Sequence, residues 1–489
     1  MRPDTSRAKV RRPGGWGLLT LLCLAQFMLV VDITVVQVAL PSIGTDLALG
    51  RAALTWVVTA YTLCFGGLMV LGGRLADTLG ARRTLLAGLG LFTAASLLCA
   101  LAGSGAVLIA GRALQGVGAA LLSPAALAVI TTVYHGERRG RALGVWAAVG
   151  GTGAAFGVLL GGLLTAGPGW AWVFVVNVPI GVLVLAAVAT AVRPTTGQTT
   201  TGPARAGAAA PGRVDVPGAV LVTAATALLI YGLVTAGDAG WGAAPTLLPL
   251  TGAALLYALF VAVERVVRTP LMRAATLARR PVISGIFVML TATGLMLALF
   301  FLSSLYLQHV RGFGALETGL LFLPVAVAIT AGAQAGGRLI PRVGGRPVAV
   351  AAFVLTAAGA ALMTGISPGA SPYATLLPGF ALAAFGIGPA FVAATTTTMA
   401  NVPPGENGVA SGVLNTFHEL GGSIGVAVAS AVAAPSLAGG PADGPAGTGG
   451  LVAGLTVCAV TAGAAALVSL GLVPPGRPAA VGHGHGHGH

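Results

Sequence analysis

Apolar residues in this chain form long uninterrupted runs, and short polar stretches separate them. Most runs are close to the roughly 20 residues that an α-helix needs to cross the hydrocarbon core of a bilayer. The pattern therefore predicts an all-α integral membrane protein. We expect about 14 membrane-spanning helices, at residues 16–40, 54–72, 84–101, 107–133, 142–164, 172–192, 217–236, 247–264, 282–307, 319–335, 347–366, 374–399, 408–434 and 451–472.

Composition supports this interpretation. Of the 489 residues, 56% are hydrophobic and 8% are charged, whereas soluble domains have about 25% charged residues. This excludes an ordinary soluble enzyme and a disordered chain. The four cysteines each lie in an apolar run, which indicates neither a disulfide framework nor a metal site. No GxxxxGK[ST] loop is present, so nucleotide hydrolysis is not indicated.

The charges indicate how the chain is oriented in the membrane. If the N-terminus is cytoplasmic, nearly all 26 Lys and Arg residues fall on the cytoplasmic side, the exceptions being Arg51, Arg112 and Arg311. By the positive-inside rule, both termini are predicted to be cytoplasmic, in the plasma membrane. The net charge of +14 then reflects topology, and no nucleic-acid partner is expected.

The chain also repeats itself. Gly73–Arg83, with the sequence GRLADTLGARR, recurs as GRLIPRVGGRP at residues 337–347. Such duplication predicts two related halves with a substrate site between them near the midplane. We expect an N-terminal tail at 1–15, a six-helix half at 16–192, a loop at 193–216, two linking helices at 217–264, a loop at 265–281, a second six-helix half at 282–473, and a His/Gly-rich tail at 474–489.

The first copy of this motif identifies a family resemblance. It matches the G-x-L-A-D-x-x-G-x-R/K-R/K loop of the major facilitator superfamily, and it follows the second span, as it does there. The resemblance implies the major facilitator fold and a gating loop, with the key residues Gly73, Asp77, Gly80, Arg82 and Arg83. In one transporter conformation, Asp77 would pair with Arg82 or Arg83, or cap a helix N-terminus.

Other motifs resemble the fourteen-helix drug:proton antiporters. Val31–Pro41 is similar to L-D-x-T-V-V-N-V-A-L-P, with Gln37 in place of Asn, and Arg112–Ala120 is similar to R-x-x-Q-G-x-G-A-A. Three departures matter. Ala171 stands where the family's W-R-W loop has Arg. Val158 replaces the proline of the antiporter motif in the fifth span, and His418-Glu419 stands where Arg-Gln is usual.

The resemblance implies efflux of drug-like or antibiotic molecules by alternating access. The proton gradient would supply the energy, without a cofactor, and the protein would act as a monomer. A proton symporter that imports a small nutrient is the alternative, because Val158 replaces the motif proline. A membrane-embedded enzyme or a lipid flippase is a third hypothesis, but histidines and carboxylates do not cluster at one depth.

Two acidic residues are predicted deep inside spans, where a charge costs on the order of 3 kcal/mol and marks a functional site by default. Asp32 lies about 24 Å along the first helix, and Arg112 lies about 9 Å below the outer face in the fourth, which allows an ion pair. Glu419 lies about 16 Å deep, near the midplane. We predict that Asp32, Arg112 and Glu419 serve proton coupling, with Arg112 tuning Asp32 because it cannot release its proton. A purely structural salt bridge or hydrogen bond is the alternative.

Polar and small residues complete the candidate site. A substrate cavity is predicted to contain Gln115, Tyr61, Asn415, His418 and Gln308, although polar residues in spans also join helices to one another. Glycines at positions 153, 157 and 161 are spaced by four, which predicts close helix packing and hinge-like sliding. The HGHGHGH tail can bind metal by composition, but we expect no metal site and no role for it in transport.

Overall fold

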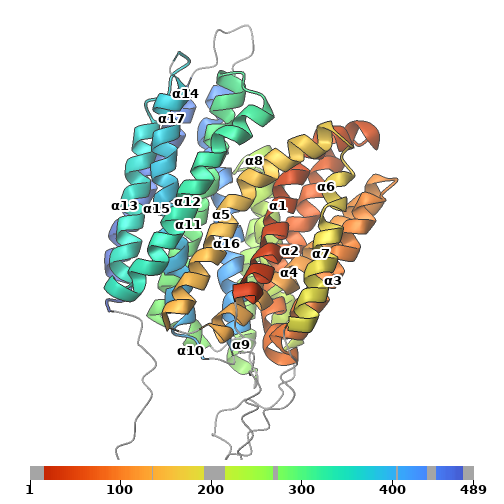
Figure 1. Ribbon diagram of the computed structural model, residues 1–489, viewed down its shortest axis with the longest axis vertical. Coiled ribbons are helices and arrows are strands. Elements are labelled where there is room, and N and C mark those ends of the chain that lie inside the picture. Colours follow the sequence, from red (N-terminus) through yellow and green to blue (C-terminus); the bar gives the residue numbers. More distant parts are fainter. Residues whose placement is uncertain are drawn as a thin grey trace, which may run out of the picture.

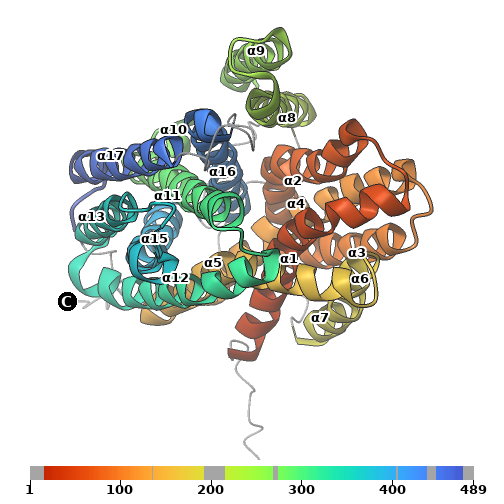
Figure 2. The same ribbon diagram turned by 90° about the horizontal axis from the view of Figure 1, so that it is seen from above.

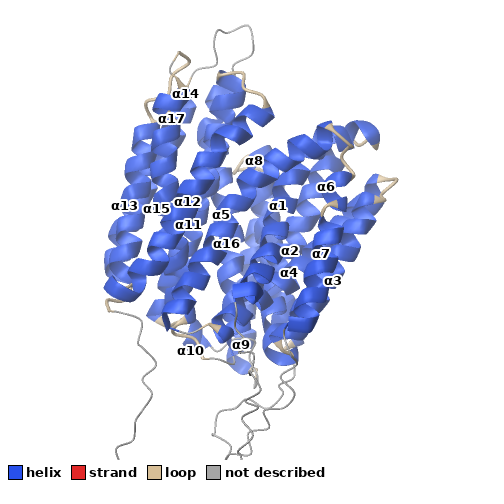
Figure 3. Cartoon of the chain, viewed as in Figure 1, coloured by secondary structure: helices blue, strands red, loops and turns tan. Residues whose placement is uncertain are grey.

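The computed structural model describes residues 16–134, 136–191, 215–267, 274–369, 371–403, 406–437 and 448–476. Throughout these ranges the regular structure is helical, without a strand (Figure 3). The predicted N-terminal tail at 1–15, most of the loop at 193–216, and the His-rich end lie outside the described residues. The all-α prediction is confirmed.

Two groups of helices lie side by side (Figure 2). The first group comprises α1 (Trp16–Asp46), α2 (Arg51–Leu79), α3 (Ala81–Ala100), α4 (Gly105–Val133), α5 (Gly136–Ala166), α6 (Trp172–Val175) and α7 (Asn177–Ala191). The second comprises α10 (Ala274–Leu277), α11 (Arg280–Leu305), the π-helix η1 (Tyr306–Val310), α12 (Ala315–Val343), α13 (Gly345–Met363), α14 (Pro372–Thr375), α15 (Leu377–Met399), α16 (Asn407–Leu437) and α17 (Gly449–Leu472). Between them in sequence come α8 (Val216–Ala239) and α9 (Ala244–Val266), which stand outside both groups, beside α2 and α16 (Figure 2).

Within the described residues, twelve helices are long and apolar enough to cross a membrane. Two further helices, α5 and α16, each have 31 residues but are not among those twelve. The multi-pass architecture is therefore established, and the total of fourteen spans stays a prediction.

The repeated motif forms the same turn twice. The turn between α2 and α3 contains Gly80 at φ 94°, and the turn between α12 and α13 contains Gly344 at φ 92°. Only glycine adopts this backbone region without strain. Each turn reverses the chain at the end of the second long helix of its group, so the duplication seen in the sequence is also present in the backbone.

Two glycine-rich seams join the groups. Along the first, α2 packs on α16: Gly73 meets the backbone of Gly408, and Gly412 meets the backbone of Met69. Along the second, α12 packs on α5, where a Cβ added at Gly337 would lie 2.8 Å from the carbonyl oxygen of Gly140. Small residues allow helix backbones to approach closely. The second helix of each group thus packs on the fifth long helix of the other, and the central space lies between these seams.

Candidate transport site

A buried ion pair lies inside the first helix group. Arg112 Nη1 donates to Asp32 Oδ2 at 2.5 Å, and Arg112 Nε donates to the carbonyl oxygen of Val57 at 3.2 Å. The other carboxylate oxygen of Asp32 accepts hydrogen bonds from Asn177 Nδ2 at 2.8 Å and Gln115 Nε2 at 3.2 Å. Both charged side chains are about 1% exposed. The ion pair expected from the helix depths is therefore present.

The Asp32 carboxylate connects three helices of the first group, α1, α4 and α7, and Arg112 adds α2 through Val57. The Arg112 guanidinium carbon also lies 4.2 Å from the centre of the Tyr61 ring and 5.9 Å from that of Phe174. A buried charge is stable only when its partners and hydrogen bonds are in place, and all of these come from α1, α2, α4 and the α6–α7 segment. The network therefore holds the first group together as one body.

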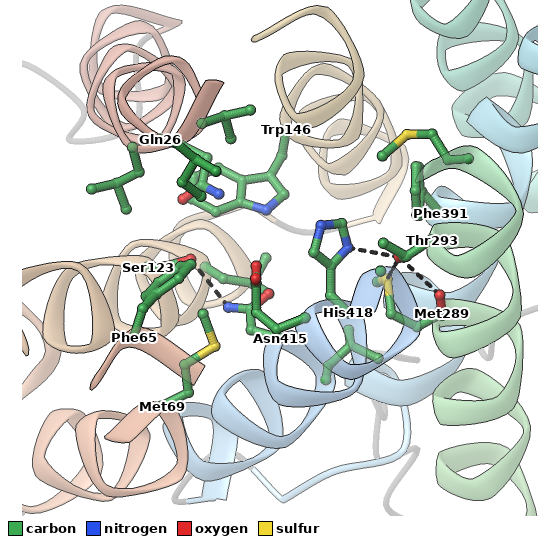
Figure 4. A pocket seen from close by; sticks show the side chains of 18 of the residues that line it. Gln26, Phe65, Met69, Ser123, Trp146, Met289, Thr293, Phe391, Asn415 and His418 are labelled. Atoms are coloured by element: carbon green, nitrogen blue, oxygen red, sulfur yellow. Dashed lines mark hydrogen bonds between the residues drawn. The ribbon is translucent and has the colours of Figure 1, made fainter. Parts of the chain in front are cut away.

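A separate cavity lies between the two groups (Figure 4). Its volume is about 160 Å³, close to that of an engineered cavity that accepts one benzene molecule. Seven helices contribute to it, from both groups. The lining residues are Gln26, Leu29, Val30, Ile33, Thr34, Phe65, Met69, Ser123, Leu127, Trp146, Met289, Thr293, Met296, Leu297, Phe391, Thr395, Leu414, Asn415, His418, Glu419 and Gly422.

The polar side chains of the cavity are joined across helices. Asn415 Nδ2 donates to Ser123 Oγ at 3.2 Å, which links α16 to α4, and His418 Nδ1 lies 2.9 Å from Thr293 Oγ1, which links α16 to α11 (Figure 4). Both bonds orient one face of α16 toward the cavity. Asn415, His418 and Glu419, all three predicted from the sequence as site residues, therefore line the same cavity.

Glu419 differs from Asp32, the other acidic residue predicted deep inside a span. Within the described ranges, the ion pair of Asp32 with Arg112 is the one salt bridge found, and no Lys or Arg lines the cavity. Glu419 is thus a carboxylate at the cavity surface without a fixed cationic partner. A cation or a proton entering the cavity would supply the missing positive charge.

Three predicted cavity residues lie elsewhere. Gln115 is fully buried in the Asp32 network, because its amide bonds Asp32 and Ser96. Tyr61 is fully buried beneath Arg112, with Phe65 between it and the cavity. Gln308 is exposed in η1 and donates to Ser304. These corrections share one cause: spans that are apolar on every side do not reveal which face points inward.

Several lining residues were not predicted. Gln26, Ser123 and Thr293 supply polar atoms, and the Gln26 side-chain oxygen has no hydrogen-bond partner among the described residues. Phe391 supplies aromatic surface. The one sequence signal that could have indicated Gln26 and Thr293 is that they are polar residues inside apolar runs. Many other residues have the same property, and they only bond the backbone of their own helix.

The gating motif forms a latch between the two groups. The Asp77 carboxylate accepts hydrogen bonds from the backbone N–H groups of Gly408 at 2.7 Å and Val409 at 2.8 Å, at the start of α16. Of the two roles predicted for Asp77, capping a helix N-terminus is the one observed. Arg82 instead donates to the carbonyl oxygen of Ala189 at the end of α7, at 2.8 Å, and Arg83 is exposed.

The second copy of the motif lacks this latch. Alignment of Gly73 with Gly337 places Pro341 where the first copy has Asp77. Pro341 packs near Gly140 of α5, 3.6 Å from the point where a Cβ at Gly140 would stand. The α5–α12 seam is therefore formed by backbone and apolar contacts.

The predicted hinge glycines pack within the first group. Gly153, Gly157 and Gly161 of α5 face Val30, Thr34 and Val35 of α1 respectively. A Cβ at Gly161 would lie 3.2 Å from the Cα of Val35, so this face allows α1 to approach closely. Close packing is confirmed, and a hinge function stays a prediction.

Comparison with known proteins decides the family. The family model of the Major Facilitator Superfamily matches residues 22–426. The chain belongs to the major facilitator superfamily. It is therefore a transporter of that superfamily and not an enzyme.

Curated relatives of this facilitator cover most of the chain. It is 40% identical to the puromycin resistance protein of Streptomyces alboniger, over 84% of this chain and 80% of the relative. It is also 40% identical to the cephamycin export protein of Amycolatopsis lactamdurans, over 84% and 83% of the two chains. The lincomycin resistance protein of Streptomyces lincolnensis is 36% identical, over 84% and 83%.

Solved structures show the same fold. The crystal structure of the human organic anion transporter MFSD10 matches with a TM-score of 0.65 at 17% identity, covering 94% of this chain and 99% of that one. The proton:xylose symporter XylE matches with a TM-score of 0.64 at 14% identity, covering 95% and 97%. At these identities the likeness concerns the facilitator fold alone.

Proposed function

We propose that this facilitator exports drug-like or antibiotic molecules across the plasma membrane in exchange for protons. The relatives named for resistance and export support the direction and the substrate class. The observation that carries the proposal is Glu419, a carboxylate without a cationic partner in a cavity between the two helix groups. We expect a monomer with both termini cytoplasmic and no cofactor.

The latch supports an assignment of the conformational state. The motif turns carry Arg74, Arg82, Arg83, Arg338 and Arg346, so the positive-inside rule places this end in the cytoplasm. There, Asp77 binds the start of α16 and both glycine seams are in contact. We infer that the structure is closed toward the cytoplasm, and that its opposite state receives the substrate.

Glu419 is the carboxylate best placed for exchange. Asp32 already has Arg112 and two amide donors, and it does not line the cavity. Glu419 lines the cavity and is not held in this way. A proton and a cationic drug would therefore compete for Glu419, and external protonation would release the drug.

Asp32 and Arg112 have a second part in the proposed cycle. Protonation of Asp32 would remove the charge that Arg112 binds, and would weaken the bonds that join α1 to α4 and α7. Arg112 itself keeps its proton. The pair would thus couple the protonation state to the packing of the first group, without contact with the substrate.

The proton gradient supplies enough energy for this cycle. One proton moving down about 100 mV releases roughly 2.3 kcal/mol. One unit of pH gradient adds about 1.4 kcal/mol. For a neutral substrate the sum of about 3.7 kcal/mol supports a several-hundred-fold gradient, since each 1.4 kcal/mol is tenfold. For a monovalent cation exchanged one for one with a proton, no net charge moves, so only the pH gradient contributes and one pH unit supports about a tenfold gradient.

Two ions of the same shape and opposite charge test this proposal. In proteoliposomes with an imposed pH gradient, we expect proton-driven movement of tetraphenylphosphonium but not of tetraphenylborate. Glu419→Gln should abolish tetraphenylphosphonium transport, and Asp32→Asn should uncouple it from the pH gradient. Glu317→Gln is the matched control, because Glu317 is exposed and caps only its own helix. Gradient-driven transport that persists in Glu419→Gln would refute the role of Glu419.

A further inference from the structure

Linker helix α8 runs along the seam where α2 meets α16 (Figure 2). A second glycine face of α2 allows it to approach: a Cβ at Gly67 would lie 3.5 Å from the Ala227 Cβ of α8. Toward α16, α8 makes contact through side chains, because Ile230 and Leu233 are buried in one cluster with Leu420. Thus the backbone of α8 lies close to α2 of the first half, whereas α8 contacts α16 of the second half through side chains.

Ile230 occupies a notch directly behind Glu419. Its Cδ1 is the atom nearest to the point where a Cβ at Gly66 would stand, and Glu419 Cβ lies 3.7 Å from the same point. Ile230 is 1% exposed and does not line the cavity, whereas Glu419 does. At this level of the seam, one isoleucine side chain fills the space between Gly66 of α2 and the backbone of α8.

The outer surface of the linker helices meets the surroundings. Val220 of α8 is 61% exposed, and the partner helix α9, which packs on α8 at Gly232, has Leu248 and Leu255 exposed by about 70%. In a membrane-spanning bundle, such apolar surface lies against lipid. The pair α8–α9 therefore stands between a cavity carboxylate and the hydrocarbon side of the protein, with Ile230 on its inner surface.

We propose that α8 is the membrane-side wall of the transport site and that Ile230 seals it behind Glu419. Without this side chain, acyl chains would reach the seam next to a group that is stable only in polar surroundings. Because α8 packs on the glycines of α2, it moves with the first half, and its Ile230–Leu233 ridge slides over Leu420 when the halves separate. The wall does not depend on whether Glu419 carries the proton.

Two carbodiimides that differ in solubility test the seal. Dicyclohexylcarbodiimide partitions into the bilayer, whereas a water-soluble carbodiimide reaches Glu419 through the cavity. In Ile230→Ala we expect labelling of Glu419 by the lipid-soluble reagent to rise several-fold, with labelling by the water-soluble reagent unchanged. Asp32, which lies away from α8, is the internal reference, and Val220→Ala is the surface control. Mass spectrometry of each carboxylate gives the ratio directly.

The contact between Gly66 and Ile230 is tested by adding a methyl group at position 66 and removing one from residue 230. Gly66→Ala places a Cβ against Ile230 Cδ1, so this variant should lose folded protein or transport. Ile230→Val removes Cδ1 and leaves Cγ1, which is 3.9 Å from the new Cβ. The double variant Gly66→Ala/Ile230→Val should therefore recover folding and keep Glu419 protected from the lipid-soluble reagent.

Each result decides the proposal independently of proton coupling. A raised lipid-to-water labelling ratio in Ile230→Ala, with recovery in the double variant, supports the wall. An unchanged ratio in correctly folded Ile230→Ala overturns it. If Ile230→Val does not relieve the defect of Gly66→Ala, the placement of the Ile230 side chain against Gly66 is wrong.

Discussion

Removal of the Asp77 carboxylate should shift the equilibrium between the two transporter states. Asp77 caps α16 from the opposite half, with bonds of 2.7 and 2.8 Å to the N–H groups of Gly408 and Val409. When the seam opens, water replaces these bonds, so the net loss is close to that of a helix N-cap, about 2 kcal/mol at the upper end. Because each 1.4 kcal/mol is tenfold, Asp77→Ala should favour the open seam by roughly 30-fold.

Thiol accessibility at the cavity measures this shift. Ser123 lines the cavity, and Ser123→Cys changes only one atom, in a background without the four native cysteines. We expect a membrane-impermeant thiol reagent, applied from the Asp77 end, to react much faster in Asp77→Ala. Asp77→Asn should be intermediate, since its amide retains one acceptor oxygen.

The control separates this effect from general helix capping. Glu317 caps its own helix α12, where its carboxylate accepts from the Gly314 N–H at 2.9 Å, and that contact does not cross between the halves. Glu317→Ala should leave the reaction rate at position 123 unchanged. Equal rates in Asp77→Ala and in the parent, at equal amounts of folded protein, would refute the latch.

Two further predictions concern stability. Arg112→Met leaves Asp32 buried without its charge partner and should destabilise the protein by about 3–5 kcal/mol; thermal unfolding in detergent should show partial recovery in Asp32→Asn/Arg112→Met. Gly157→Ala places a methyl group against the Thr34 side chain and 3.1 Å from the Val31 carbonyl oxygen, so we expect a loss of about 1–3 kcal/mol. Gly162→Ala, with nothing within 4 Å, is its matched control and should be neutral or stabilising; equal melting temperatures for the two alanine variants would contradict the packing argument.

The fold was predictable because every span must bury its backbone polar groups in a helix of known minimum length. Span ends were less accurate. The apolar run of the second span ends at residue 72, yet α2 continues to Leu79, since the polar motif from Arg74 to Asp77 remains helical beyond the hydrocarbon. Likewise, α5 begins at Gly136, six residues before its apolar run.

The site was only partly predictable. Asp32, Arg112 and Glu419 were found because charges are rare in spans, and helix depth alone brought the first two together. Tyr61 and Phe65 lie one helical turn apart, but only Phe65 lines the cavity, and neighbouring helices decide this. The partner of Asp77 is 331 residues away along the chain, a separation that no local pattern encodes.

The two seams differ in a way that bears on how the halves rock. The α2–α16 seam ends in a carboxylate that binds free N–H groups, whereas the α5–α12 seam has Pro341 beside Gly140 and no equivalent carboxylate. Water can replace the first contact stepwise, whereas among the described side chains no hydrogen bond between α5 and α12 is found at the second. Because the two copies of the motif differ in this way, we expect the end of the molecule that carries them to open asymmetrically, widest beside α2, where α8 packs.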